Sequence, residues 1–345
     1  MILTVFGLVI LILPIYSKFK IILALTSEYS RISYIKKKSK TQHLIVLGEC
    51  GVESFEAFLE ELYNDDHGNT NYDTVIMQSF PNEEIMKLVK NLNFPNKICY
   101  LVGNCLIHRD LERTQAENSI CAIILANKLA KNPSFEDFSN IMKAFSFRKY
   151  SYIFGNGEST RICIQLLRPE TKEIYFSSLA GENSSDDQVI CVEEIKLQLL
   201  GKSCLCPGIT TIISSLITSK KPTLADEDFE QTKELKSISE YLEGIQREIY
   251  VITLKAEYIH NLHFIDLVKR LYEICGIIAI GIDVIIDDIK PFVCLNPVHY
   301  LMSPFDHSVY ILADSQPNEV EINNKLRDYL ENTQKSRKNA FFAEK

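Results

Sequence analysis

The chain has 345 residues, of which 46% are hydrophobic and 24% charged, and its formal net charge is -8. This composition is typical of a globular protein, and it excludes a wholly disordered chain, a collagen-like chain and a membrane protein with many spans. The acidic balance argues against a nucleic-acid partner, because proteins that bind nucleic acids are usually basic. Ten cysteines are too few for a disulfide scaffold, so we expect reduced thiols in a cytosolic body.

Residues 1–25 differ from the rest of the chain because they are almost entirely apolar, interrupted mainly by Lys18 and Lys20. A transmembrane helix over 1–25 is the preferred interpretation, and a signal peptide and a buried core helix are the alternatives. Several basic residues follow closely, so the positive-inside rule predicts a membrane protein whose remaining residues lie in the cytoplasm. Residues 26–42 are then a linker.

Apolar runs alternate with helical patterns between residues 43 and 182. The predicted strands cover residues 43–48, 74–77, 98–102, 119–126 and 161–167. The predicted helices cover residues 53–64, 82–91, 106–113 and 135–150, the last with Ser134 as its N-cap. This alternation predicts an α/β fold in 43–182, a Rossmann-like doubly wound parallel sheet.

The pattern changes after residue 182. Residues 183–222 contain two apolar helices, predicted over 189–200 and 209–217, which form a helix-turn-helix and need a partner surface. Residues 223–315 follow as a smaller α+β lobe, with strands predicted at 248–254, 277–282 and 308–312. Residues 316–345 are a polar tail that begins as a helix.

Gly48 and Gly51 stand where a Rossmann fold carries its phosphate-binding loop, but the further glycines of the dinucleotide fingerprint are missing. We therefore predict no bound NAD. The chain also lacks a nucleophile elbow and a second cysteine pair at zinc spacing, so nothing in it predicts an enzyme. A Rossmann-type nucleotide-binding protein is kept as the least favoured hypothesis.

Several segments, in order and with few gaps, resemble one family over roughly residues 43–315. They are residues 43–48, 123–128, 136–142, 191–197, 203–208, 241–248 and 295–297. These segments resemble the first regulator-of-potassium-conductance (RCK) domain of large-conductance calcium-activated potassium channel alpha subunits, the BK or Slo family. The resemblance implies a homotetrameric cytosolic gating ring in which calcium controls a potassium pore. Residues 1–25 would then be the end of the pore-lining helix.

The same resemblance implies a calcium site. Asp66 falls on the aspartate of the family's first calcium site and Glu248 on its glutamate, while Glu61 lies near another acidic position. The family's loop that supplies a backbone carbonyl reads Ser219-Lys220 here, in place of Met-Arg.

The family's magnesium site fits the sequence less well. Asp73 matches one of its carboxylates, but Cys99 stands at the other position, and a thiol is a poor ligand for a hard cation. We expect no magnesium site there.

A selectivity filter of the Thr-Val-Gly-Tyr-Gly type is not present in the 345 residues. The sequence is therefore compatible with two membrane-bound readings. It is either the gating-ring portion of a channel or a non-conducting, membrane-anchored subunit that modulates one.

Overall fold

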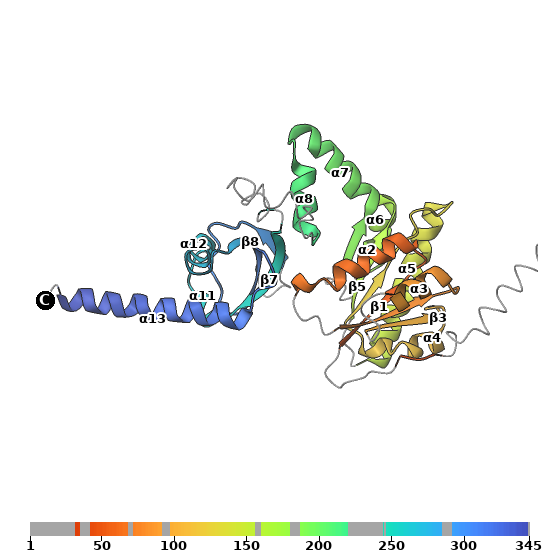
Figure 1. Cartoon of the computed structure of the whole chain (residues 1–345), viewed down its shortest axis with the longest axis horizontal. Helices are drawn as coiled ribbons and strands as arrows, with labels where there is room; N and C mark the ends of the chain where they lie inside the picture. The colour runs from red at the N-terminus through yellow and green to blue at the C-terminus, as the bar shows by residue number, and fades with distance from the viewer. Residues whose placement is uncertain are drawn as a thin grey trace, which may run out of the picture. The chain divides into compact units, whose positions relative to one another are not determined.

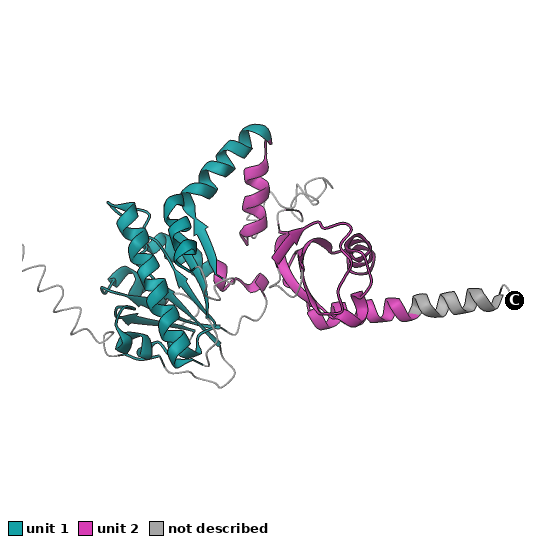
Figure 2. Ribbon diagram, turned by 180° about the vertical axis from the view of Figure 1, so that it is seen from behind, with its two compact units in different colours: residues 1–60, 70–205 teal, residues 61–69, 206–345 magenta. Residues whose placement is uncertain are grey.

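A computed structural model describes residues 32–34, 42–67, 72–91, 97–155, 160–179, 187–219, 244, 246–284 and 292–343 (Figure 1). The chain divides into two units, which Figure 2 shows in different colours. The first unit comprises residues 1–60 and 70–205, and the second comprises residues 61–69 and 206–345. The short segment 61–69 therefore belongs to the second unit, although its neighbours in sequence belong to the first.

The first unit is built on a six-stranded parallel sheet in the order β3-β2-β1-β4-β5-β6. Its strands are β1 (Gln42–Leu47), β2 (Tyr72–Gln78), β3 (Ile98–Val102), β4 (Cys121–Ile124), β5 (Arg161–Leu166) and β6 (Gln188–Cys191). After their first residue, β1 and β2 are buried without interruption, as expected for strands covered on both faces. The predicted Rossmann-like parallel sheet is confirmed.

Helices flank this sheet and bury their apolar sides against it (Figure 1). They are α2 (Val52–Leu62), α3 (Glu83–Asn91), α4 (His108–Arg113), α5 (Pro133–Phe154) and α6 (Pro169–Ser178), with the short turn η3 (Ala116–Asn118). The short turn η2 (Asp65–His67) belongs to the second unit. The fully buried side chains of the unit include Phe147 of α5 and Tyr175 of α6.

The start of α5 differs from the prediction. Its N-cap is Asn132, whose side chain accepts a hydrogen bond from the backbone N–H of Phe135 at 3.2 Å. Pro133 follows at the first helical position, where a missing N–H leaves no hydrogen bond unmade. Ser134 is inside the helix, and its hydroxyl accepts a hydrogen bond from Arg168. The prediction of Ser134 as the cap is therefore wrong.

The end of the first unit holds two elements that the sequence patterns did not indicate. Helix α6 lies between β5 and β6, and strand β6 occupies the residues predicted as the first turn of a helix. Helix α7 (Val192–Leu205) begins only after that strand. The short run Gln188–Cys191 pairs with β5 in parallel, and a four-residue apolar run does not distinguish a strand from a helix by periodicity.

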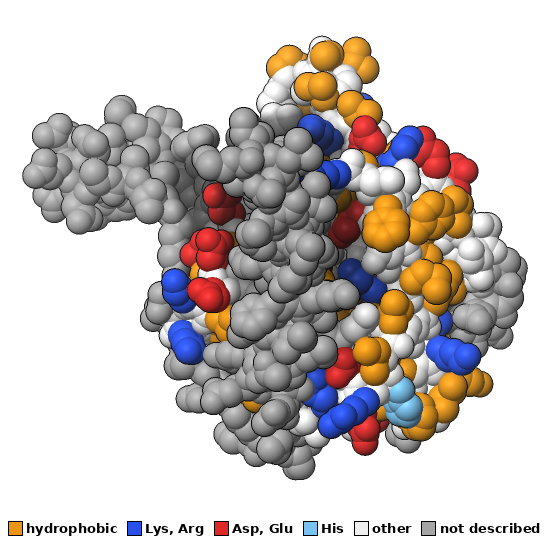
Figure 3. Space-filling view, turned by 90° about the vertical axis from the view of Figure 1, so that its right-hand side faces the viewer, with side chains coloured by type: hydrophobic (Ala, Val, Ile, Leu, Met, Phe, Trp, Pro, Cys, Tyr) orange, Lys and Arg blue, Asp and Glu red, His pale blue; other side chains and the backbone are white. Residues whose placement is uncertain are grey.

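Helices α7 and α8 (Ile209–Ile217) bury none of their residues. Large hydrophobic side chains are exposed on both of them, among them Leu200, Leu205 and Ile217. Figure 3 shows further hydrophobic side chains in groups on one face of the molecule. Exposed apolar surface of this kind is typical of an interface.

The second unit contains a four-stranded antiparallel sheet in the order β7-β10-β8-β9. Its elements are β7 (Glu248–Leu254), α11 (Ala256–Ile259), α12 (Phe264–Cys275), β8 (Ile278–Val284), β9 (Phe292–Leu295), β10 (His307–Ala313) and α13 (Glu319–Ala343). Helix α12 places Phe264, Leu267 and Leu271 in the core at helical spacing. Three of the four strands were predicted, and β9 was not.

The transmembrane helix predicted at 1–25 and most of the linker at 26–42 lie outside the described residues. Among the helices that the structure does describe, none combines the length and the apolar character needed to cross a membrane.

Candidate metal centre

Glu248 is the first residue of strand β7, and its carboxylate is buried. Residues alternate along this strand between the core and the solvent, and the inward set runs Glu248, Tyr250, Ile252, Leu254. Side chains two residues apart share one face of a strand, so Glu248 lies on the core face and is only 4% exposed. A buried carboxylate is costly unless hydrogen bonds or a cation stabilise its charge.

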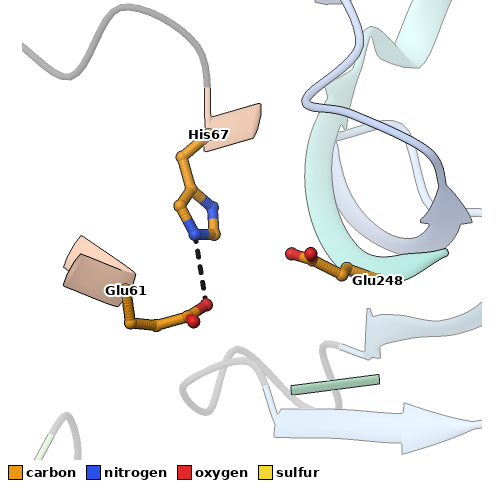
Figure 4. A group of neighbouring side chains, drawn as sticks. All are labelled: Glu61, His67 and Glu248. Atoms are coloured by element: carbon orange, nitrogen blue, oxygen red, sulfur yellow. Dashed lines mark hydrogen bonds and ion pairs between the residues drawn. The ribbon is translucent and has the colours of Figure 1, made fainter. Parts of the chain in front are cut away.

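Two further donors face Glu248 from another part of the second unit. Glu61 lies near the end of α2 and His67 ends the short turn η2, and their side chains point toward each other in Figure 4. Nε2 of His67 lies 3.3 Å from Oε1 of Glu61. One ligand atom from each of Glu61, His67 and Glu248 lies within 4.8 Å of the other two. We call these three residues the donor cluster.

Ser219, two residues after the end of α8, contacts every member of the donor cluster. Its hydroxyl lies 3.1 Å from Oε1 of Glu61, 3.2 Å from Nε2 of His67 and 3.0 Å from Oε2 of Glu248. Its backbone N–H also donates to Oε2 of Glu61 at 3.2 Å. The small side chain of Ser219 therefore reaches into the centre of the cluster.

Tyr250 adds a hydrogen bond from the core side. Its hydroxyl donates to Oε2 of Glu248 at 3.3 Å, and its ring meets the ring of His67 edge-on at 6.0 Å. Burial, followed by the negative charge of Glu248, raises the pKa of Tyr250, so the phenol stays protonated and able to donate at neutral pH.

Asp66, predicted as a calcium ligand, lies in η2 but is not a member of the donor cluster. Its carboxylate is near enough to Tyr250 for its charge to add to the rise in the pKa of that phenol. Both backbone polar groups of Asp66 are hydrogen-bonded: its N–H donates to the side-chain oxygen of Asn64, and its carbonyl accepts from the N–H of Gln316 at 2.9 Å. Of the three predicted ligands, the structure brings Glu61 and Glu248 together.

All of these residues lie in the second unit, because segment 61–69 is grouped with residues 206–345. An ion held by Glu61 and Glu248 would therefore hold together two distant parts of the sequence within one unit.

Asp73, the position considered for magnesium, is a buried residue of β2 in the first unit. Its Oδ2 accepts a hydrogen bond from the hydroxyl of Tyr34 at 2.8 Å. Cys99 lies on the neighbouring strand, where it pairs with Val75. The hydrogen bond from Tyr34 to Asp73 attaches Tyr34 to the start of β2.

The sequence patterns did not predict His67, a member of the donor cluster, or Ser219, which contacts all three members. His67 directly follows Asp66, which the resemblance identifies as a candidate ligand, but the resemblance does not point to the histidine. Ser219 was noted as a departure from the family, and a hydroxyl in a loop gives no signal of its contacts. The spacing of Glu61 and His67, six residues apart across a helix end, matches no regular periodicity that would have shown them to be neighbours.

Comparison with known proteins identifies the family. Residues 39–194 match the model of the calcium-activated potassium channel slowpoke-like RCK domain, and residues 187–282 match that of the calcium-activated BK potassium channel alpha subunit. The calcium-activated potassium channel slo-1 of Caenorhabditis elegans is 26% identical over 275 residues, which are 78% of this chain and 23% of that protein. The slowpoke channel of Drosophila melanogaster is 26% identical over 226 residues, which are 65% of this chain and 18% of that protein.

The chain thus spans about a quarter or less of the length of these relatives. Among solved structures, the human SLO3 gating ring superimposes with a TM-score of 0.59 at 20% identity, over 80% of this chain and 44% of that one. At this identity the likeness supports the fold alone, and it agrees with the parallel sheet of the first unit. The two family matches run together over residues 39–282, and the chain belongs to the slowpoke (Slo) family of calcium-activated potassium channels, of which it carries the RCK domain.

Proposed function

We propose that this chain is the calcium-regulated gating portion of a potassium channel subunit and has no enzymatic activity. The family matches over residues 39–282 carry this proposal, because both models describe calcium-activated potassium channels. The chain would lie in the cytoplasm beneath a membrane pore, attached through residues 1–25.

Calcium is the proposed ligand, bound by Asp66 and Glu248 with Glu61 nearby. Calcium prefers six to eight oxygen ligands, including carboxylates and backbone carbonyls. The buried carboxylate of Glu248, the half-buried carboxylate of Glu61 and the charge of Asp66 near Tyr250 supply the negative field for such an ion. Calcium can open a pore only if it binds the open arrangement more tightly than the closed one, so that occupancy shifts the population.

The proposed assembly is a homotetramer that uses α7 and α8. These helices leave large hydrophobic side chains exposed and bury none of their residues in the described chain. A second copy would cover this apolar surface, which a lone chain leaves in water at a cost in free energy.

The test is calorimetric titration of the full 345-residue chain with Ca²⁺. Asp66→Asn and Glu248→Gln are each expected to weaken calcium binding by at least about tenfold, since each removes a negative charge from the site. Asp314→Asn is the matched control, because Asp314 is an exposed carboxylate of the same unit, paired with Arg247 at the surface. Unchanged calcium affinity in both site variants would show that these residues do not bind the ion.

A further inference from the structure

The donor cluster contains an imidazole nitrogen beside two carboxylates, and this set of ligand atoms suits metal ions other than calcium. Glu61, His67 and Glu248 come from α2, η2 and β7, and Figure 4 shows their polar ends converging. The three ligand atoms lie within 4.8 Å of one another. Glu248 is buried, while Glu61 and His67 are half-buried, with exposed side-chain fractions of 38% and 28%.

The hydroxyl oxygen of Ser219 marks the point at which the cluster converges. It lies between 3.0 and 3.2 Å from a polar atom of each of the three residues. A hydroxyl carries one proton, so it can donate to only one of the two carboxylates at a time. The other carboxylate then faces a lone pair of the same oxygen, and its charge is not offset by this contact.

The charges in the cluster are also unbalanced. Within the described part of the chain, Glu61 forms an ion pair with His67, and no lysine or arginine pairs with either glutamate. Two carboxylates close together and partly withdrawn from water repel each other, and a bound cation relieves this repulsion. A positive ion at the centre of the cluster would therefore lower its electrostatic free energy.

The donor atoms indicate which kind of ion. Calcium takes oxygen ligands and has little affinity for an imidazole nitrogen. Zinc and its neighbours among the divalent transition metals bind imidazole and carboxylate readily, at about 2.0–2.2 Å, and zinc accepts four ligands in a tetrahedron. Two glutamates and one histidine supply three such ligands, and the space now held by the Ser219 hydroxyl lies between them.

We propose that Glu61, His67 and Glu248 form a binding site for a divalent transition-metal ion of the zinc type, with water as the fourth ligand. The ion takes the central position, and the Ser219 hydroxyl moves away from it. This site shares Glu61 and Glu248 with the proposed calcium site but does not depend on calcium being the physiological ligand. The two sites differ in one ligand each: His67 binds only the transition metal, and Asp66 binds only calcium.

The experiment measures Zn²⁺ and Ca²⁺ binding separately on the full chain by calorimetry. Cys204 and Cys206 are exposed thiols that would also capture zinc, so all variants carry Cys204→Ser and Cys206→Ser. In this background His67→Gln is expected to weaken Zn²⁺ binding by at least about tenfold and to change Ca²⁺ affinity by less than about twofold. Asp66→Asn is expected to weaken Ca²⁺ binding by at least about tenfold and to change Zn²⁺ affinity by less than about twofold. The control is His260→Gln, which removes an exposed histidine of the same unit.

Cobalt gives an independent readout, because four-coordinate Co²⁺ absorbs visible light far more strongly than the octahedral aqueous ion. Co²⁺ added to the parent protein is expected to develop this intense absorption, and His67→Gln is expected to abolish it. If His67→Gln and His260→Gln have the same zinc affinity, or if bound cobalt keeps the weak octahedral spectrum, the proposed site is wrong. If zinc binding depends on His67 but the protein has no calcium affinity, the zinc-type site is supported and the calcium proposal is wrong. If the protein binds calcium but not zinc, the calcium proposal is supported and the zinc-type site is wrong.

Discussion

Replacing Asp187 with alanine is expected to destabilise the first unit by about 3–5 kcal/mol, the usual cost of removing one partner from a buried ion pair. Asp187 pairs with Arg148 of α5, and both side chains are less than 10% exposed. The same carboxylate accepts hydrogen bonds from the hydroxyl of Tyr175 at 2.7 Å and from the backbone N–H of Ile162 at 3.2 Å. The variant leaves all three donors without this acceptor and one guanidinium charge buried without its carboxylate.

Urea unfolding followed by circular dichroism measures this effect, since the chain has no tryptophan to report by fluorescence. The matched control is Asp314→Ala, which removes the carboxylate of an exposed pair with Arg247 and should change stability by less than about 1 kcal/mol. The double variant Arg148→Met with Asp187→Leu should recover most of the loss, because no unpaired charge remains buried. An Asp187→Ala protein as stable as the control would show that the pair contributes nothing.

The core of the first unit was predictable because its signals are local and mutually consistent. The strands β1, β2 and β3 are short apolar runs bounded by turn residues, and each alternates with a helical pattern. Parallel strands in such an arrangement are buried on both faces, so burial and periodicity lead to the same assignment. The observed strand order could then be expected from the usual topology of this fold.

The errors occur where the local signal is weak or where distant residues decide the structure. Strand β6 has four residues, and each pairs with a residue of β5 that lies 25 positions earlier in the chain. Helix α6 is held by Asp137, a buried residue of α5 that accepts hydrogen bonds from the N–H groups of Leu167 and Arg168. Neither contact can be predicted from the sequence around the element that it stabilises, because the partner residue lies elsewhere in the chain.

The candidate site was predictable only through family resemblance. Strand β7 is apolar at most positions on both faces, so its sequence does not reveal that Glu248 faces the core. The convergence of Glu61, His67 and Ser219 brings together residues up to 158 positions apart, a distance over which periodicity carries no information. The resemblance pointed to Glu61 and Glu248, whereas His67 and Ser219 needed coordinates to be recognised as their neighbours.

Gly48→Ala is expected to cost about 4 kcal/mol, through backbone strain and overpacking together. Gly48 follows β1 with φ = 121°, a conformation that residues with a side chain rarely adopt. A Cβ atom at this position would lie 2.1 Å from the carbonyl oxygen of Leu125, just after β4. That carbonyl belongs to a backbone held in place, since the N–H of Leu125 donates to the carbonyl of Leu47 at 2.8 Å.

Gly51 provides the matched control three residues later, because a Cβ atom there would meet nothing within 4 Å. Gly51→Ala should change the free energy of unfolding by less than about 1 kcal/mol, so the two variants differ in steric contact and not in residue type. The measurement is the urea midpoint of the first unit for each variant. Equal midpoints would contradict the steric argument. The expected difference would assign Gly48 a steric role that needs no bound phosphate. In dinucleotide-binding folds a glycine after the first strand lets the backbone approach the dinucleotide. Here Gly48 lets the end of β1 lie against the backbone that follows β4.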